Sequence, residues 1–151
     1  MPFKINLSEK SGKTFKIEAE AEELIGKTLH DKVNGSDISP ELQGYELEIT
    51  GASDGAGFTA MENVEGIGLK KTLLKFGKGL KKRPKHEGKR KRAKNRPKGF
   101  KLRKTVRGKV ISPAIVQINL KVLKHGEKTL HQIFPDQNQP KEKPEAPAQA
   151  A

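Results

Sequence analysis

The stretch IVQINLKV, residues 115–122, decides the fold of this chain. Its apolar residues Val116, Ile118, Leu120 and Val122 alternate with polar ones. Because successive side chains of a β-strand point to opposite faces of a sheet, this alternation places the four apolar side chains on one face. The stretch therefore predicts a half-buried strand, and no other part of the chain carries a clearer strand signal.

Other segments repeat this alternation of apolar and polar residues, namely FKINL at 3–7, FKIEA at 15–19 and YELEI at 45–49. We expect residues 8–13, which include Gly12, to form a hairpin loop between the first two strands. Apolar residues return after the basic part of the chain, over Val106–Ile111. These patterns predict an all-β fold that is completed by the strands within Val106–Val122.

Three segments are less clear in their secondary structure. Leu24–Val33 is compatible with a short strand or a helical turn, because Gly26 interrupts it. Leu69–Phe76 holds leucines among lysines and is compatible with a strand or with two turns of helix. We expect Leu130–Phe134 to form a last short strand.

The composition limits the size of the hydrophobic core. The chain has 151 residues, of which 32% are hydrophobic, and its mean hydropathy is −0.75. This length suggests one domain, and the apolar residues cluster in 1–76 and 105–134. We expect a single β domain over residues 1–134. Residues 135–151 contain four prolines and no apolar residue larger than alanine after Pro135, which predicts a disordered C-terminal tail.

Several classes of chemistry are not expected from the residue types. The chain has no cysteine, so disulfides, thiolate zinc sites and a cysteine nucleophile are excluded. His30, His86, His125 and His131 show no ligand-like spacing, and no nucleophile stands beside a base. We therefore expect no enzyme, metal, cofactor or small-molecule substrate. The sequence contains no apolar run of about 18 residues, so we expect no membrane span. No apolar signal region is found either, and we therefore expect a cytoplasmic protein.

The positive charge of the chain sits in one segment. Residues 70–109 contain twenty Lys or Arg and a single acid, Glu87, for a net charge of +19. Residues 1–69 carry −7 and residues 110–151 carry +1. Such a segment repels itself, whereas a nucleic acid would neutralise it and release condensed counterions. The alternative is a solvated charged face, but solvated faces normally mix both signs.

Glycines and prolines scattered over residues 77–104 exclude a long helix there. We therefore predict that these residues form a long, irregular basic arm interrupting the β domain. Its surroundings contain only two aromatic residues, Phe76 and Phe100, which are too few for a base-stacking platform. Recognition of the RNA backbone and shape is the better interpretation.

The candidate rRNA-binding residues are the cations of this arm from Lys81 onward and the one that follows it: Lys81, Lys82, Arg83, Lys85, Lys89, Arg90, Lys91, Arg92, Lys94, Arg96, Lys98, Lys101, Arg103, Lys104 and Arg107. Among them Arg90, Arg92, Arg96 and Arg103 are the preferred anchors. The planar fork of arginine holds a phosphate through two hydrogen bonds, whereas lysine acts as a point charge.

The glycine-rich stretch GASDGAGF, residues 51–58, follows the strand at 45–49 and invites a nucleotide-binding interpretation. Gly55, Gly57 and Ala60 fit a loose dinucleotide-binding pattern. However, Gly66 and Gly68 break the helix that this pattern requires, and no Walker sequence occurs. A tight bend that needs positive φ angles is the simpler explanation.

Two groups of residues resemble a known family, the small-subunit ribosomal protein S six family of the archaeal and eukaryotic type. The first group runs from Gly44-Tyr45 through Ile49 to Gly51, Ser53, Asp54, Gly57 and Phe58. The second comprises Lys104–Gly108, Ile115–Val122 and Gly126-Glu127, and the basic Arg83-Pro84 and Gly88–Arg92 lie between the two groups. The order of these motifs covers most of residues 1–134.

The sequence also departs from the family pattern. Ala52 replaces a glycine, Thr59-Ala60 stands where Pro-Met is usual, and Ala93–Leu102 resembles an insertion. The phosphorylated C-terminal helix of eukaryotic members has no counterpart, since no Ser or Thr follows Thr129. The sequence is thus of the archaeal kind.

The resemblance implies a small β-barrel domain on the body of the small ribosomal subunit, with basic extensions that enter the rRNA. The implied partners are small-subunit rRNA and neighbouring small-subunit proteins, with no membrane, and the implied location is the ribosome. The role would be structural. The alternative is a nucleic-acid-binding or RNA-chaperone-like protein that acts outside the ribosome.

Overall fold

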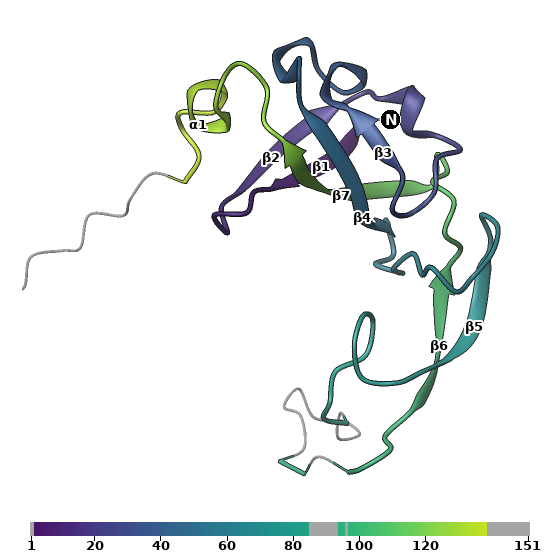
Figure 1. The fold of residues 1–151 in the computed structure, drawn as a ribbon. Helices are drawn as coiled ribbons and strands as arrows, with labels where there is room; N and C mark the ends of the chain where they lie inside the picture. Colours follow the sequence, from purple (N-terminus) through teal and green to yellow (C-terminus); the bar gives the residue numbers. More distant parts are fainter. Residues whose placement is uncertain (1, 85–93, 96, 139–151) are drawn as a thin grey trace, which may run out of the picture.

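A computed structural model describes residues 2–84, 94–95 and 97–138 of the chain. Its strands are β1 (Phe3–Ser8), β2 (Thr14–Ala19), β3 (Lys32–Asn34), β4 (Glu46–Asp54), β5 (Leu69–Leu74), β6 (Leu102–Arg107) and β7 (Ile115–Lys124). Its helical turns are η1 (Glu22–Leu24), η2 (Gly35–Asp37), η3 (Pro40–Leu42) and α1 (Leu130–Ile133). The prediction of an all-β fold is confirmed (Figure 1).

Five of these strands form one sheet in the order β2-β1-β7-β4-β3. The central strand is β7, the strand predicted from the alternation at 115–122, and it lies between β1 and β4 (Figure 1). It pairs with β4 antiparallel and with β1 parallel. The hairpin predicted around Gly12 is confirmed by the antiparallel pairing of β1 with β2. Strands distant in sequence therefore meet on β7.

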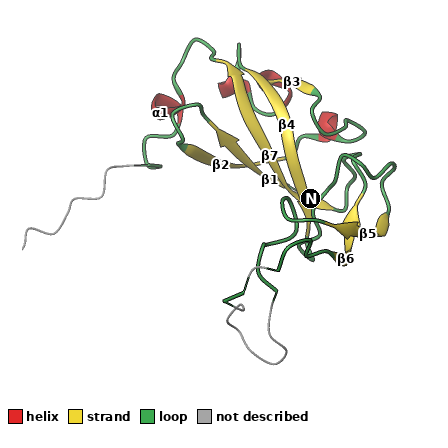
Figure 2. Cartoon of the chain, turned by 60° about the horizontal axis from the view of Figure 1, so that its bottom comes forward, coloured by secondary structure: helices red, strands yellow, loops and turns green. Residues whose placement is uncertain are grey.

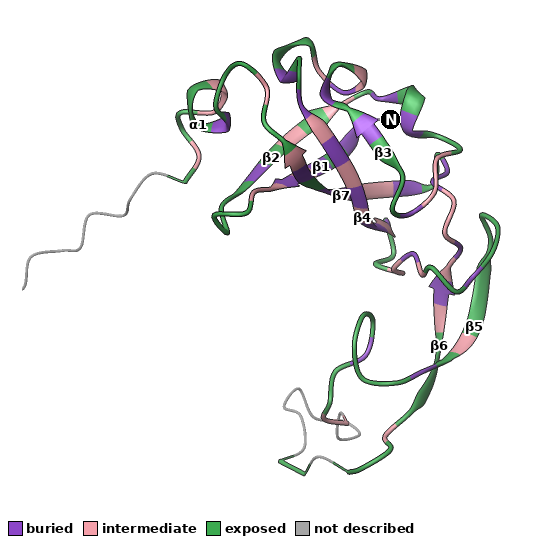
Figure 3. Cartoon of the chain, viewed as in Figure 1, coloured by how far each residue is buried: buried purple, intermediate pink, exposed green. Residues whose placement is uncertain are grey.

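The hydrophobic core lies on one face of this sheet. Ile118 and Leu120 on β7 are fully buried, as are Ile5 and Leu7 on β1. Figure 3 shows the buried segments concentrated in the sheet rather than in the hairpin of β5 and β6. The alternation in the sequence thus predicted the buried facing of Ile118, Leu120 and Val122 correctly. It was wrong for Val116, because an irregularity in the pairing of β4 with β7 leaves Val116 half-buried and buries Ile115 instead. Burial of each large aliphatic side chain contributes about 1.5–3 kcal/mol relative to an exposed position.

The predicted barrel is not found as a closed structure. Within residues 2–84 and 97–138, no backbone pairing joins the sheet's outer strands β2 and β3. The resemblance suggested closure, but β3 contains only three residues and pairs on one side with β4. The five-stranded sheet is therefore an open sheet, with β2 and β3 as its two edge strands.

The strands β5 and β6 form a separate two-stranded hairpin, which we call the basic ribbon (residues 69–74 and 102–107). It extends away from the five-stranded sheet (Figures 1 and 2). A second, small core of Val64, Leu74, Leu80 and Val106 lies against it. The ambiguous segment Leu69–Phe76 is thus a strand over most of its length.

The expected last strand at Leu130–Phe134 is wrong, because residues 130–133 form the short helix α1. The side chain of Gln132 accepts a hydrogen bond from the backbone N–H of Thr129 at 3.1 Å. This contact satisfies one of the free N–H groups that a helix start leaves unpaired. A Thr followed three residues later by Gln is a known start signal, and it outweighs the strand propensity of this short segment.

The folded part of the chain also extends past the predicted start of the tail at Pro135. The side chain of Gln137 accepts from the N–H of Lys16 at 2.7 Å and donates to its C=O at 2.8 Å. Asn138 donates to the C=O of Thr14 at 2.9 Å. These amide groups pair with the open edge of β2, where polar backbone groups are otherwise left to water. The rest of the predicted tail, residues 139–151, lies outside the described residues.

Candidate nucleic-acid interface

The register of the basic ribbon determines where its charged side chains point. Lys71 of β5 pairs with Thr105 of β6, and Leu73 pairs with Arg103. Opposite residues of an antiparallel pair share a face, so Lys71 and Arg103 lie on the face turned away from the small core. The other face carries Leu74 and Val106, which are buried. The ribbon therefore presents cations on a support that is anchored from one side.

The base of the ribbon is held to the main sheet by an ion pair. The Nε of Arg107 donates to Oδ2 of Asp54 over 2.9 Å, and the Asp54 side chain is only 5% exposed. The other carboxylate oxygen accepts from the N–H of Phe58 at 2.8 Å. Burial alone would raise the pKa of Asp54, but the hydrogen bonds from Arg107 and Phe58 outweigh it and lower that pKa. The Asp54 carboxylate therefore stays charged and fixes the ribbon.

This ion pair assigns a structural role to two features of the sequence. Arg107 was predicted to bind rRNA, but its guanidinium is half-buried and committed to Asp54, and it also donates to the C=O of Ile67 at 3.3 Å. The glycine-rich stretch is the predicted tight bend: it carries Asp54, and Gly57 has a φ of +84°. The bend therefore serves to orient a carboxylate toward Arg107.

Gly108 completes the junction between the ribbon and the sheet. A Cβ atom at this position would lie 1.8 Å from the carbonyl oxygen of Gly66. The N–H of Gly108 donates to the C=O of Gly68 at 3.1 Å. Only glycine permits the two backbones to approach so closely. The glycine that ends the Lys104–Gly108 motif thus has a packing function.

The described candidate residues are mostly exposed on the ribbon and at its far end. The exposed ones are Lys81, Lys82, Lys94, Lys98, Lys101, Arg103 and Lys104, and Arg83 is half-buried. The candidates Lys85, Lys89, Arg90, Lys91, Arg92 and Arg96 lie outside the described residues, as do residues 85–93 and 96 of the predicted irregular arm as a whole. One boundary of that arm is wrong, because Leu102–Lys104 belongs to β6 and pairs with β5. No glycine or proline interrupts the chain there, so pairing continues.

Some cations of this region are engaged within the chain. Lys104 donates to the C=O of Gly79 at 3.4 Å, and Lys78 donates to the C=O of Thr50 at 3.0 Å. The ammonium of Lys82 lies 4.5 Å from the centre of the Phe76 ring. These contacts are weak and exposed, so a phosphate can compete for the same ammonium groups.

The sequence prediction missed the exposed lysines of β5 and its end, Lys70, Lys71 and Lys75. They were counted in the basic segment but left out of the candidates, because the arm was expected to begin later. The pairing of β5 with β6 places Lys71 on the same face as Arg103, whereas Lys70, opposite Val106, lies on the other face. Lys75 lines a pocket together with Lys101. Charge density alone would have included them.

Neither a metal-binding cluster nor a membrane-spanning helix is found in the part of the chain that the structure describes. No group of three or more His, Asp or Glu within residues 2–84, 94–95 and 97–138 could hold a metal ion. None of the helices there is long and apolar enough to cross a membrane.

The fold is that of an all-β protein with a small sheet and a projecting basic ribbon. Exposed positive charge is concentrated on this extension. The model of the family described as ribosomal protein S6e matches residues 3–135. The chain is similar to the small ribosomal subunit protein eS6 of Archaeoglobus fulgidus, with 39% identity over 140 residues, covering 89% of this chain and 96% of the relative. It is also similar to the eS6 proteins of Methanothermobacter thermautotrophicus (39% over 137 residues, 89% and 96% covered) and Methanococcus maripaludis strain C5 (37% over 131 residues, 86% and 94% covered).

The chain therefore belongs to the ribosomal protein S6e family. The resemblance seen in the sequence is confirmed, including its archaeal character. This family consists of structural ribosomal proteins, so the expectation that the chain is not an enzyme is also confirmed.

Proposed function

We propose that this protein is a structural component of the small ribosomal subunit that binds rRNA through the basic ribbon and the arm beyond it. Family membership supports the ribosomal role. The observation that carries the RNA-binding part is the set of exposed cations on the ribbon and at its far end. Among the described residues, no carboxylate lies within ion-pair distance of Lys71, Lys75, Lys101 or Arg103.

The charge distribution supports different roles for the sheet and the ribbon. Ion pairs in the sheet involve acids of the N-terminal part, as in Lys32–Glu46 at 3.1 Å and Lys124–Glu46 at 2.7 Å. The ribbon has cations in excess, and a polyanion would release the counterions that such an excess accumulates. We propose that the sheet is a rigid base and that the basic segment contacts phosphates. We also propose that residues 1–134 form one domain, interrupted by an arm that ends where β6 begins at Leu102.

The proposed partners are small-subunit rRNA and the small-subunit proteins beside it, with the protein bound to ribosomes in the cytoplasm. The proposed contacts are the candidate residues other than Arg107, together with Lys70, Lys71 and Lys75. Arg107 is left out because its guanidinium is paired with Asp54.

Two measurements test this proposal. In sedimentation after a wash with moderate salt, the protein should remain with small subunits, and release into the free fraction would favour a nucleic-acid-binding protein outside the ribosome. In filter binding to a transcript of small-subunit rRNA, the affinity should fall steeply as salt rises. Binding that does not depend on salt would contradict the role of the ribbon.

A further inference from the structure

The two aromatic residues of the basic segment line one pocket at the far end of the ribbon. Paired residues of β5 and β6 end with Leu74 opposite Leu102. Continuing this register by two residues on each strand would place Phe76 opposite Phe100. The strands separate there instead, and a pocket of about 580 Å³ opens between them, which is within the usual range of ligand pockets. It is lined by Lys75, Phe76, Lys82, Pro97, Gly99, Phe100 and Lys101.

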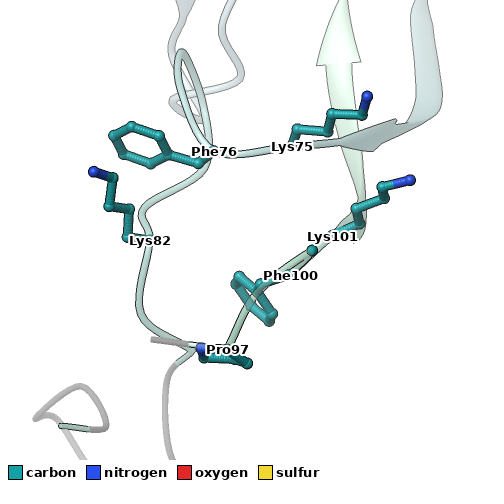
Figure 4. A pocket seen from close by; sticks show the side chains of 7 residues that line it. Lys75, Phe76, Lys82, Pro97, Phe100 and Lys101 are labelled. Atoms are coloured by element: carbon teal, nitrogen blue, oxygen red, sulfur yellow. The ribbon is translucent and has the colours of Figure 1, made fainter. Parts of the chain in front are cut away.

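The two rings differ in how they are held. Phe100 packs against the small core of Val64, Leu74, Leu80 and Val106, so its position is anchored. Phe76 is 59% exposed, and the Lys82 ammonium lies 4.5 Å from its ring centre (Figure 4). Apart from this ammonium, the ring has no aromatic partner, since none of the ring–ring contacts among the described residues involves Phe76. This arrangement is explained if the ring has a partner outside the chain.

The lining of the pocket indicates which partner fits. Aromatic faces stack on nucleobases, and this interaction is tolerant of base identity because every base has a π-face. The three lysines suit the phosphates of the nucleotide, and the lining side chains include no carboxylate or amide that could read the edge of a base. The pocket therefore matches one nucleotide by stacking and charge, with little preference among bases.

We propose that this pocket receives a single unstacked base of the bound RNA, which stacks on Phe76 while Lys75, Lys82 or Lys101 contacts its phosphates. Bases in bulges and loops are the ones available to stack on aromatic side chains. The inference rests on the proposed function and adds one base contact to binding that is otherwise directed at the backbone. An acidic peptide would also satisfy the lysines, but it would leave the exposed ring without a planar partner.

The test compares two fluorescein-labelled RNA hairpins, one with a single bulged nucleotide and one with the same stem fully paired. Fluorescence anisotropy with the full chain should show tighter binding of the bulged hairpin. Stacking of one base on an aromatic side chain corresponds to a gain of about five- to 150-fold. Changing the bulged base from A to U should alter this gain little.

Matched variants assign the effect to the ring. Phe76→Ala should remove the preference for the bulged hairpin but leave the affinity for the paired hairpin and both salt slopes unchanged. Phe76→Trp should restore the preference. Leu73→Ala is the control, because Leu73 is also an exposed apolar residue of the ribbon, at 58%, but does not line the pocket.

The outcomes separate this inference from the proposed function. Equal affinity of the unchanged protein for the two hairpins would overturn the base pocket and leave backbone binding intact. Equal weakening of both hairpins by Phe76→Ala would overturn it as well. Failure of the unchanged protein to bind either hairpin in a salt-dependent way would reject RNA binding by the ribbon itself.

Discussion

The Nε of Arg107 lies 2.9 Å from Oδ2 of Asp54, and this contact joins the last residue of β6 to the last residue of β4. Both side chains are largely shielded from water, at 16% and 5% exposure. The pair therefore fixes the orientation of the basic ribbon relative to the main sheet. A residue predicted to bind RNA directly thus has a structural role in positioning those that would.

Replacing Arg107 by alanine should destabilise the protein strongly. The change leaves the Asp54 carboxylate largely buried without its partner, and breaking such a pair typically costs about 3–5 kcal/mol. We expect a value near 3 kcal/mol, because Arg107 retains some contact with water. Urea denaturation followed by circular dichroism measures the free energy of unfolding.

Lys109→Ala provides the control for this experiment. Lys109 also forms an ion pair, with Glu65 at 3.1 Å, but Glu65 is 83% exposed. Exposed pairs contribute about 0–1 kcal/mol, so this variant should remain close to the unchanged protein. A similar loss in both variants would show that burial of Asp54 does not set the strength of the Arg107 contact.

Replacing Ile118 by alanine tests the core of the sheet. Ile118 has no exposed surface and lies on β7, between β1 and β4. Truncation of a buried isoleucine leaves a cavity and costs about 2–5 kcal/mol. Thermal or urea unfolding should show this loss, whereas Lys121→Ala, at an exposed position of the same strand, should stay within about 0.5 kcal/mol. An unchanged stability of the Ile118 variant would disprove the assignment of the buried face.

The strands of the main sheet could be predicted from the sequence because the alternation of apolar residues reports directly on burial. Residues 3–7, 45–49 and 117–122 each bury the face that the pattern indicated, and only Val116 at the start of β7 departs from it. The order of the strands was beyond this reasoning, since the parallel pairing of β1 with β7 joins residues more than a hundred positions apart. The closed barrel came from the resemblance, and the pairing found here does not support it.

The candidate site was harder to predict because charge density does not reveal pairing. The sequence marked Arg107 as a cation but could not show the carboxylate of Asp54 beside it. It also showed Phe76 and Phe100 as isolated aromatics, because only the register of β5 with β6 brings them to one pocket. The helix at 130–133 was missed although Thr129 and Gln132 carried a start signal.

His30 should make the stability of the protein depend on pH. Its Nδ1 lies 2.9 Å from Glu48 and its Nε2 lies 2.9 Å from Glu62, and hydrogen bonds to these two carboxylates raise the pKa of His30. A raised folded-state pKa means that protonated His30 contributes its full stabilisation below the ordinary value of about 6.5. This contribution is lost as the pH rises through the raised pKa. The effect is modest because the His30 side chain is half exposed.

His30→Asn is the appropriate variant for this measurement. His30 has a φ of +73°, and asparagine is among the residues that tolerate this left-handed conformation. The variant therefore removes the titrating group without adding backbone strain. Denaturation midpoints between pH 5.5 and 8.5 should fall with rising pH more steeply in the unchanged protein than in the variant. Parallel curves for the two proteins would mean that His30 does not carry the pH dependence.

Arg103→Ala tests the electrostatic part of RNA binding at a residue that the structure describes. Arg103 is exposed on the outward face of the ribbon, and no carboxylate within the described residues pairs with it. Each phosphate contact contributes about 0.7–0.9 to the slope of log affinity against log salt, so the variant should lower the slope by about that amount. Matched and scrambled RNAs should weaken alike, because a phosphate contact carries no sequence information. Lys124→Ala is the control, since Lys124 pairs with Glu46 in the main sheet at 2.7 Å and should leave the slope unchanged. If Arg103→Ala abolished the preference for one RNA sequence while keeping the slope, Arg103 would be reading bases instead of holding the backbone.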